Sequence, residues 1–187
     1  MVLSKTLTLI GFQACGKTTL GKILANRFNC SFIDTDQLIE HGHPSLSCRE
    51  IFQTFGAAYF RHCESQAIIS LKFQPAMVLA VGGGSLLDST NANILKRETF
   101  LIYLKTSAEI LKQRIRQQPT LPAYFHLNHS HQTFVQLYQE RCSIYEQWAD
   151  ARIEMDGLSQ EEAMQQLIKI TQTIEETDGF KFIRNNF

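Results

Sequence analysis

The sequence lacks a surplus of charge: 18 Lys and Arg residues balance 18 Asp and Glu residues in a chain of 187. Proteins that bind nucleic acid usually carry a clustered basic excess. No apolar run approaches the roughly 20 residues that a membrane-spanning helix needs, and no small-residue cleavage site follows the short apolar segment near the N-terminus. We therefore expect neither a nucleic-acid partner nor a membrane partner.

The sequence also lacks paired cysteines. Its five cysteines are scattered and form no C-x-x-C pair, which is typical of reduced thiols in the cytoplasm. Internal repeats, low-complexity tracts and long linkers are missing as well. A chain of this length can bury a proper core. We therefore expect a single domain over residues 1–187 in a cytoplasmic protein. The expected oligomeric state, a monomer, does not follow from these observations.

What the sequence does contain is an alternation of short apolar runs and segments with helical spacing. Apolar runs lie at 6–10, 77–81 and 99–104, and short strand-like segments lie at 30–34 and 151–155. The helical segments lie at 17–29, 61–73, 88–97, 107–117, 131–149 and 159–175. Strands that are apolar on both faces and alternate with helices indicate a parallel sheet covered on both sides. The pattern predicts a three-layer α/β/α fold with about five strands.

The stretch GFQACGKT, residues 11–18, matches the phosphate-loop pattern G-x-x-x-x-G-K-[ST] between a predicted strand and a predicted helix. The two glycines permit backbone angles that direct successive N–H groups toward phosphate oxygens. Lys17 would bridge the outer phosphates, and the Thr18 hydroxyl would bind Mg²⁺. A glycine turn that only caps a helix is the less favoured alternative. The predicted nucleotide-binding residues are Gly11, Ala14, Cys15, Gly16, Lys17, Thr18 and Thr19.

Asp34 and Asp36 follow a predicted strand directly, beside the phosphate loop. Because successive strand residues point to opposite faces, these two carboxylates share a face. One can serve Mg²⁺, while the other accepts hydrogen bonds from a substrate and takes a proton from the attacking hydroxyl. The alternative is a pair of strand-end carboxylates that cap a helix.

Several longer motifs point to a particular family. The guanine-reading N-K-x-D and the D-x-x-G switch of GTPases are missing, and a small chain of this kind is most often a kinase for small molecules. The stretches LIGFQACGKTTLGKILANRF, FIDTD, YFRHCE, AVGGG, IYLKTS and ERCSIYEQWAD occur in the order and spacing seen in shikimate kinases. Over roughly residues 5–170, the chain resembles this family.

The resemblance implies that the protein transfers the γ-phosphoryl group of ATP to the 3-hydroxyl of shikimate, with Mg²⁺, in the pathway to chorismate and the aromatic amino acids. It also implies a P-loop kinase fold with strand order 2-3-1-4-5. A shikimate-binding subdomain is expected at about residues 35–63 and a lid at about residues 113–130.

The resemblance further implies roles for single residues. Asp34 would lie near the metal, and Asp36 would act on the substrate. Arg61 and Arg141 would hold the substrate carboxylate, for which a planar guanidinium is suited. These two arginines rest mainly on the resemblance, since an arginine on a helix is usually a solvated surface residue. The remaining residues implied are Gly82, Gly83 and Gly84 at shikimate, Arg114 near the adenine, and Glu64 as a partner that orients Arg61 or as an ordinary helix pair.

The lid region departs from the family. Shikimate kinases usually carry a lid arginine that reaches the transferred phosphoryl group, but this chain has no arginine from 117 to 140. Arg116 is the nearest candidate to replace it, and we count it with Lys17 and Asp36 as catalytic. A histidine from the stretch HLNHSH is a second candidate, and a slow enzyme is the third outcome.

Two other functions remain open from the sequence. A kinase for another small acceptor such as gluconate would share the architecture, but it would give no reason for the combination of the Asp34-x-Asp36 pair with Arg61 and Arg141. A nucleotide-binding regulatory protein without turnover is suggested by the lid alone. The intact residues that weigh against it are Lys17, Thr18, Asp34 and Asp36.

Overall fold

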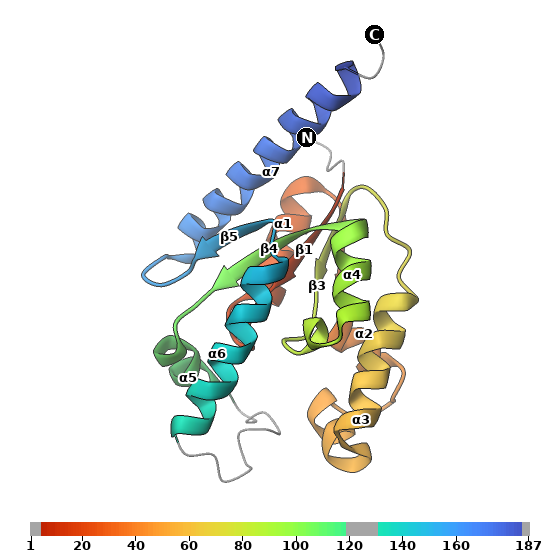
Figure 1. The fold of residues 1–187 in the computed structure, drawn as a ribbon, viewed down its shortest axis with the longest axis vertical. Helices are drawn as coiled ribbons and strands as arrows, with labels where there is room; N and C mark the ends of the chain where they lie inside the picture. The colour runs from red at the N-terminus through yellow and green to blue at the C-terminus, as the bar shows by residue number, and fades with distance from the viewer. Residues whose placement is uncertain (1–4, 119–130, 185–187) are drawn as a thin grey trace.

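The computed structural model describes residues 5–118 and 131–184, and a five-stranded sheet forms its centre (Figure 1). The strands are β1 (Thr6–Ile10), β2 (Ser31–Asp34), β3 (Met77–Ala80), β4 (Thr99–Lys105) and β5 (Ala151–Glu154). Their order is β2-β3-β1-β4-β5, and all four pairings are parallel. The predicted parallel sheet and the strand order implied by the resemblance are both confirmed.

Helices cover both faces of this sheet (Figure 1). On one face, α1 (Lys17–Phe28) packs against α7 (Gln160–Arg184), and on the other face lie α4 (Ser89–Glu98) and α6 (His131–Trp148). This arrangement follows from right-handed crossovers between parallel strands. The connection from β1 to β2 moves along the sheet in the opposite direction to those from β3 to β4 and from β4 to β5, so its helix lies on the opposite face. The remaining elements are α2 (Thr35–His41), α3 (Cys48–Ile69), the short 3₁₀ helix η1 (Ser85–Leu87) and α5 (Ala108–Arg116).

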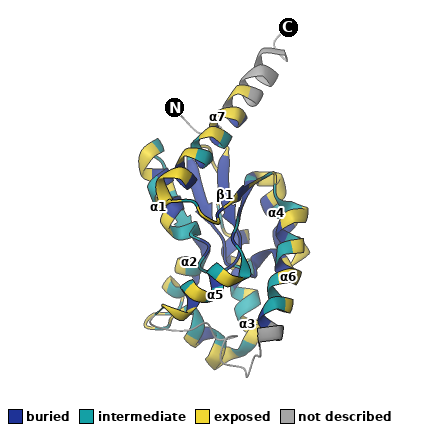
Figure 2. Cartoon of the chain, turned by 90° about the vertical axis from the view of Figure 1, so that its left-hand side faces the viewer, coloured by how far each residue is buried: buried dark blue, intermediate teal, exposed yellow. Residues whose placement is uncertain are grey.

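The core lies between the sheet and the two helical layers (Figure 2). Every residue of β1 and β3 is buried, whereas the edge strands β2 and β5 are partly exposed. Continuous apolar runs therefore mark the central strands. Within residues 5–118 and 131–184, no helix combines the length and hydrophobicity needed to cross a membrane. Fully buried core residues include Leu7, Leu9, Val78, Leu79, Leu101 and Leu104.

The prediction of a helix over 61–73 was wrong at both ends, because α3 begins at Cys48 and ends at Ile69. A capping box starts it: the Ser47 hydroxyl accepts from the Glu50 amide, and the Glu50 carboxylate accepts from the Ser47 amide. The letters SCRE carry this signal in the sequence. The helix bends at Gly56, where φ is 84°, so its apolar spacing is interrupted.

Two further helical segments differ from expectation. No helix was predicted over α2, but the alternative of a strand-end carboxylate that caps a helix is confirmed for Asp34. Its carboxylate accepts a hydrogen bond from the Asp36 amide at the start of α2. The last helix begins as predicted, with a capping box between Ser159 and Glu162, but it continues to Arg184 instead of ending near residue 175. Residues 119–130 of the expected lid lie outside the described residues.

We predict that Ser47→Ala lowers the free energy of unfolding by about 1 kcal/mol, because α3 loses its N-terminal cap. Urea-induced unfolding followed by circular dichroism measures this change. The matched control is Ser143→Ala, since Ser143 is exposed within α6 and its hydroxyl bonds only to the preceding turn. The control should change stability by no more than about 0.5 kcal/mol. Equal effects of the two substitutions would contradict the role of the cap.

Candidate active site

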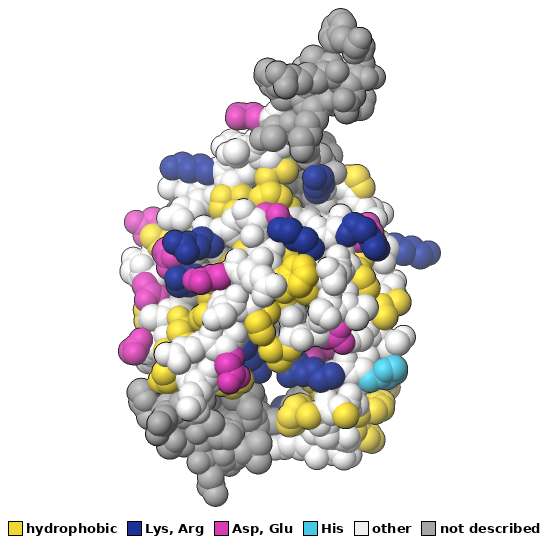
Figure 3. All heavy atoms as spheres, in the orientation of Figure 1, with side chains coloured by type: hydrophobic (Ala, Val, Ile, Leu, Met, Phe, Trp, Pro, Cys, Tyr) yellow, Lys and Arg dark blue, Asp and Glu magenta, His cyan; other side chains and the backbone are white. Residues whose placement is uncertain are grey.

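A cavity of about 580 Å³ opens at the carboxyl ends of β1, β2 and β3, the edge at which ligands bind in open parallel sheets. In the space-filling view, Lys and Arg side chains border a hollow beside α3 (Figure 3). The cavity is lined by Gln13, Ala14, Gly16, Lys17, Thr18, Thr19, Asp34, Asp36, Cys48, Arg49, Phe52, Phe60, Arg61, Glu64, Val81, Gly82, Gly83, Gly84, Arg114, Gln118 and Arg141.

The phosphate-loop motif forms one side of this cavity. Gly16 caps the N-terminus of α1 with a φ of 107°, a conformation that an L side chain rarely adopts. The first turn of α1 contains no acidic residue, so the positive end of the helix dipole is available to an anion. The Lys17 ammonium donates to the carbonyls of Gly11 and Phe12, both at 2.9 Å. The loop is therefore arranged as an anion site with its lysine close by.

Asp34 connects this loop to the next strand end. One of its oxygens accepts from the Thr18 hydroxyl at 2.7 Å, and the other accepts from the Asp36 amide at 3.1 Å. Hydroxyl and carboxylate oxygens are the donors that Mg²⁺ prefers, and proteins often supply only one or two of them beside substrate phosphates. Among the described residues there is no group of three or more His, Cys, Asp or Glu placed to hold a metal. The Thr18–Asp34 pair fits a magnesium ion of this kind.

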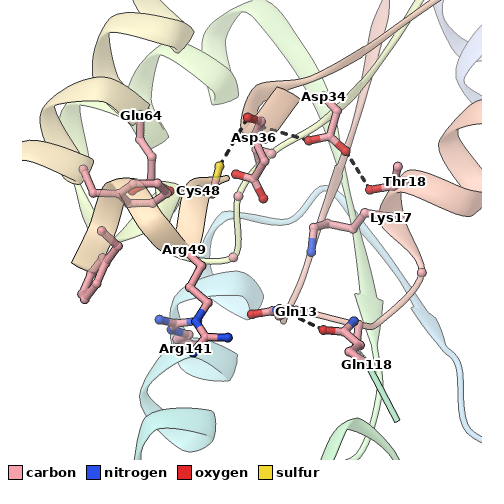
Figure 4. Close-up of a pocket in the computed structure, with 18 of the residues that line it drawn as sticks. Gln13, Lys17, Thr18, Asp34, Asp36, Cys48, Arg49, Glu64, Gln118 and Arg141 are labelled. Carbon is pink, nitrogen blue, oxygen red and sulfur yellow. Dashed lines mark hydrogen bonds between the residues drawn. The ribbon is translucent and has the colours of Figure 1, made fainter. Parts of the chain in front are cut away.

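Asp36 points into the cavity between the phosphate loop and α3 (Figure 4). Burial, followed by the negative charges of Asp34, Glu64 and Glu40, raises the pKa of Asp36 to about 7, although Lys17 acts in the opposite direction. A carboxylate with such a pKa is a stronger base than an ordinary aspartate and is suited to accept a proton near neutral pH. The neighbouring Cys48 thiol donates to the Asp36 carbonyl at 3.3 Å, and burial raises the pKa of this thiol.

The three glycines after β3 line the cavity, and charged side chains lie close to the backbone at Gly82 and Gly84. A methyl group on Gly82 would lie 2.7 Å from the Glu64 carboxylate and 2.8 Å from the Asp36 carboxylate. On Gly84 it would overlap the guanidinium of Arg61. Glycine at positions 82 and 84 therefore permits the close approach of charged groups from α2 and α3 to this loop.

Arg61 and Arg141 reach the cavity from α3 and α6, and each is held by the protein. Arg61 donates to Glu64, which is fully buried and also accepts from the Ser85 hydroxyl at 3.1 Å. The guanidinium of Arg141 lies 5.0 Å from the centre of the Phe12 ring, a cation–π distance. Side chains fixed in this way lose little entropy when they bind a carboxylate.

Most of the residues predicted from the sequence meet at this cavity, but some do not line it. Gly11 and Cys15 lie within the phosphate loop, with Cys15 buried. Arg114 donates to the Ala14 carbonyl at 3.3 Å, next to the loop. Arg116 is exposed at the end of α5, beside Glu109 and Lys112, and is not among the lining residues. Its catalytic role stays a prediction, and His126 and His129 lie outside the described residues.

Some of the residues that line the cavity were not predicted from the sequence. Four of the missed residues come from α3, whose first half was not predicted as a helix. The capping signal SCRE would have started the helix at the right place and put residues 48, 49 and 52 in its first two turns. The missed residues are Gln13, Cys48, Arg49, Phe52, Phe60, Val81 and Gln118.

Comparisons with known proteins show the family. A family model described as shikimate kinase matches residues 13–172. The shikimate kinases of Thermodesulfovibrio yellowstonii and Alkaliphilus oremlandii are 32% and 33% identical over 165 residues, which is 88% of this chain and 94% and 97% of theirs. The solved shikimate kinase of Acinetobacter baumannii in complex with shikimate is 27% identical. It matches with a TM-score of 0.79 over 91% of this chain and 94% of its own.

We predict that the carboxyl group of Asp36 titrates near pH 7 in the protein without nucleotide or metal. Carbon-13 NMR of labelled aspartate measures this pKa, and the resonance lost in Asp36→Asn assigns it. Asp34→Asn should lower the pKa of Asp36, because it removes a neighbouring negative charge while an amide can still cap α2. A titration of Asp36 close to the ordinary value of 3.8 would contradict the description of the site.

The same pKa has a consequence for stability. Between about pH 4 and pH 7 the folded protein holds a proton on Asp36 that the unfolded chain has already lost, so rising pH lowers the free energy of unfolding in this window. The Asp36→Asn variant lacks this pH-dependent decrease. The free energy of unfolding of the wild type, measured relative to that of Asp36→Asn, should therefore fall between about pH 4 and pH 7 and level off at higher pH.

Proposed function

The chain belongs to the shikimate kinase family, and from this premise we propose that it transfers the γ-phosphoryl group of ATP to the 3-hydroxyl of shikimate. The observation that carries the proposal is that one cavity is lined by a phosphate loop, by Asp36 with its raised pKa, and by the two arginines Arg61 and Arg141. A phosphate donor and an acidic, hydroxylated acceptor can bind there side by side. Phosphoryl transfer depends largely on such positioning and on charge neutralisation.

The nucleotide binds on the side of α1. Loop amides and the N-terminus of α1 hold the phosphates, and the Lys17 ammonium exchanges the carbonyls of Gly11 and Phe12 for phosphate oxygens. Arg114, which is hydrogen-bonded to the loop at Ala14, supplies a planar group near the adenine. Thr18 and Asp34 hold Mg²⁺, which neutralises phosphate charge when it is bound.

The acceptor binds on the side of α3. Arg61 and Arg141 hold its carboxylate, and the close-packed glycine loop contacts its ring. Asp36 accepts the proton of the 3-hydroxyl while that oxygen forms a bond to the γ-phosphorus and the bond from phosphorus to the ADP oxygen breaks. The raised pKa of Asp36 suits it to this step.

We also propose that the protein acts as a monomer in the cytoplasm. One chain supplies all the residues assigned to the two substrates, so this account requires no partner subunit. All five cysteines are free thiols, which fits a reducing compartment.

A coupled assay of ADP release tests the proposed function. We expect turnover with magnesium-ATP and shikimate, and only a background rate with gluconate or without an acceptor. Turnover with gluconate but not with shikimate would identify a kinase for another acceptor. Tight ATP binding without turnover on either acceptor would favour a regulatory, binding-only protein and would contradict the proposal.

We predict that Asp36→Asn lowers kcat by roughly 10²–10⁴-fold, because the variant has no carboxylate to accept the proton. The dissociation constant for ATP, measured by calorimetry, should stay unchanged. Asp88→Asn is the matched control, since Asp88 caps α4 on the surface away from the cavity and asparagine caps equally well. Near-normal turnover of Asp36→Asn would remove Asp36 from the proposed role.

A further inference from the structure

Arg49 lines the same cavity but has none of the contacts that hold the other cavity arginines. Arg61 is paired with Glu64, and Arg141 lies against Phe12. Within the described part of the chain, Arg49 has no ion pair, and its Nε atom is buried without a hydrogen-bond partner. A buried polar group of this kind costs stability unless a ligand satisfies it. Arg49 is therefore placed where a ligand would supply the missing contact.

The helix gives no structural reason for an arginine at this position. Arg49 lies in the first turn of α3, where the helix dipole disfavours a positive charge. Its acidic neighbour Glu50 is engaged elsewhere, since one oxygen of Glu50 accepts from the amide and the hydroxyl of Ser47 at 2.8 and 2.7 Å. The hydrogen bonds from Ser47, and to a lesser degree the charge of Arg49, lower the pKa of Glu50, but no hydrogen bond joins the side chains of Arg49 and Glu50.

The backbone around Arg49 is nevertheless firmly held. The Ser47–Glu50 capping box fixes the start of α3, and the amide of Cys48 donates to Glu40 at 2.9 Å. The Cys48 thiol donates to the carbonyl of Asp36. Arg49 therefore projects from a rigid turn that is bonded directly to the segment carrying Asp36.

From this turn, the side chain of Arg49 extends across the cavity toward Arg141 of α6 (Figure 4). Five cationic side chains line the cavity against three carboxylates, so its balance is positive. The cations are Lys17, Arg49, Arg61, Arg114 and Arg141, and the carboxylates are Asp34, Asp36 and Glu64. Two guanidinium groups directed into one space repel each other, and an anion bound between them relieves that repulsion.

We propose that Arg49 is a specificity-determining residue that joins Arg61 and Arg141 in binding the carboxylate of the acceptor. This inference rests on the proposed function and adds to it a contact from the first turn of α3. Glu64 offsets the charge of Arg61, whereas Arg49 adds a guanidinium that forms no ion pair with a side chain of the described residues. The donor phosphates bind at α1, on the opposite side of the cavity from the N-terminal end of α3.

The test compares Arg49→Ala with the wild-type enzyme on two ligands, shikimate and its uncharged methyl ester. The variant should raise KM for shikimate by about 10- to 100-fold, the usual effect of one charge-assisted hydrogen bond. Because a carboxylate contact distant from the reacting hydroxyl acts equally on ground and transition states, kcat and KM for ATP should change little. The inhibition constant of the ester, which lacks the charge, should be nearly the same for both proteins.

Two further variants control the comparison. Arg97→Ala removes an exposed arginine of α4 that is paired with Glu98, and it should leave all these constants unchanged. Arg49→Lys keeps the charge without the planar fork and should recover part of the affinity for shikimate. Arg49→Ala should unfold at a temperature no lower than that of the wild type, since it removes a buried polar atom without a hydrogen-bond partner.

The outcomes separate this inference from the proposed function. An unchanged KM for shikimate in Arg49→Ala, or an equal loss of affinity for the ester, would overturn the assignment of Arg49 while leaving shikimate phosphorylation intact. Absence of shikimate phosphorylation by the wild-type enzyme would overturn the proposed function and this inference together.

Discussion

The site depends on the carboxylate of Asp34, whose two oxygens hold the Thr18 hydroxyl and the Asp36 amide at the same time. This residue ends β2 and caps α2, so it fixes the direction in which Asp36 leaves the sheet. Through Thr18 it also fixes the start of α1. The groups that bind the donor and those that act on the acceptor are thus placed relative to each other by one buried side chain.

The two ends of the cavity carry different charged and polar groups, although the net charge of the protein is zero. The phosphate loop offers amides and Lys17, while α3 and α6 offer guanidinium groups. Asp36 lies between them, and burial with neighbouring negative charge raises its pKa. Glycines after β3 let these charged groups approach the backbone closely. A donor and an acceptor that are both anionic can therefore share a small cavity without a strongly basic protein surface.

The sheet and the phosphate-binding side of the cavity could be predicted from the sequence, because the phosphate loop and the strand-like segments are local patterns that each indicate one kind of structure. The part of the cavity lining that α3 supplies could not be predicted in this way. Its first half is interrupted at Gly56, and its start depends on the short capping signal at Ser47. The hydrogen bond from Ser85 to Glu64 and the position of Arg49 opposite Arg141 involve residues distant in sequence, which only the fold brings near.

Phosphorus NMR of the reaction tests the central claim most directly, by following the γ-phosphorus of ATP in the presence of the enzyme, Mg²⁺ and shikimate. The account predicts that this resonance is replaced by that of a phosphate monoester on the 3-hydroxyl, in step with the appearance of ADP. Appearance of the phosphorus as inorganic phosphate, with shikimate unchanged, would contradict it. The cavity would then admit water, and not the acceptor, at the position where Asp36 acts.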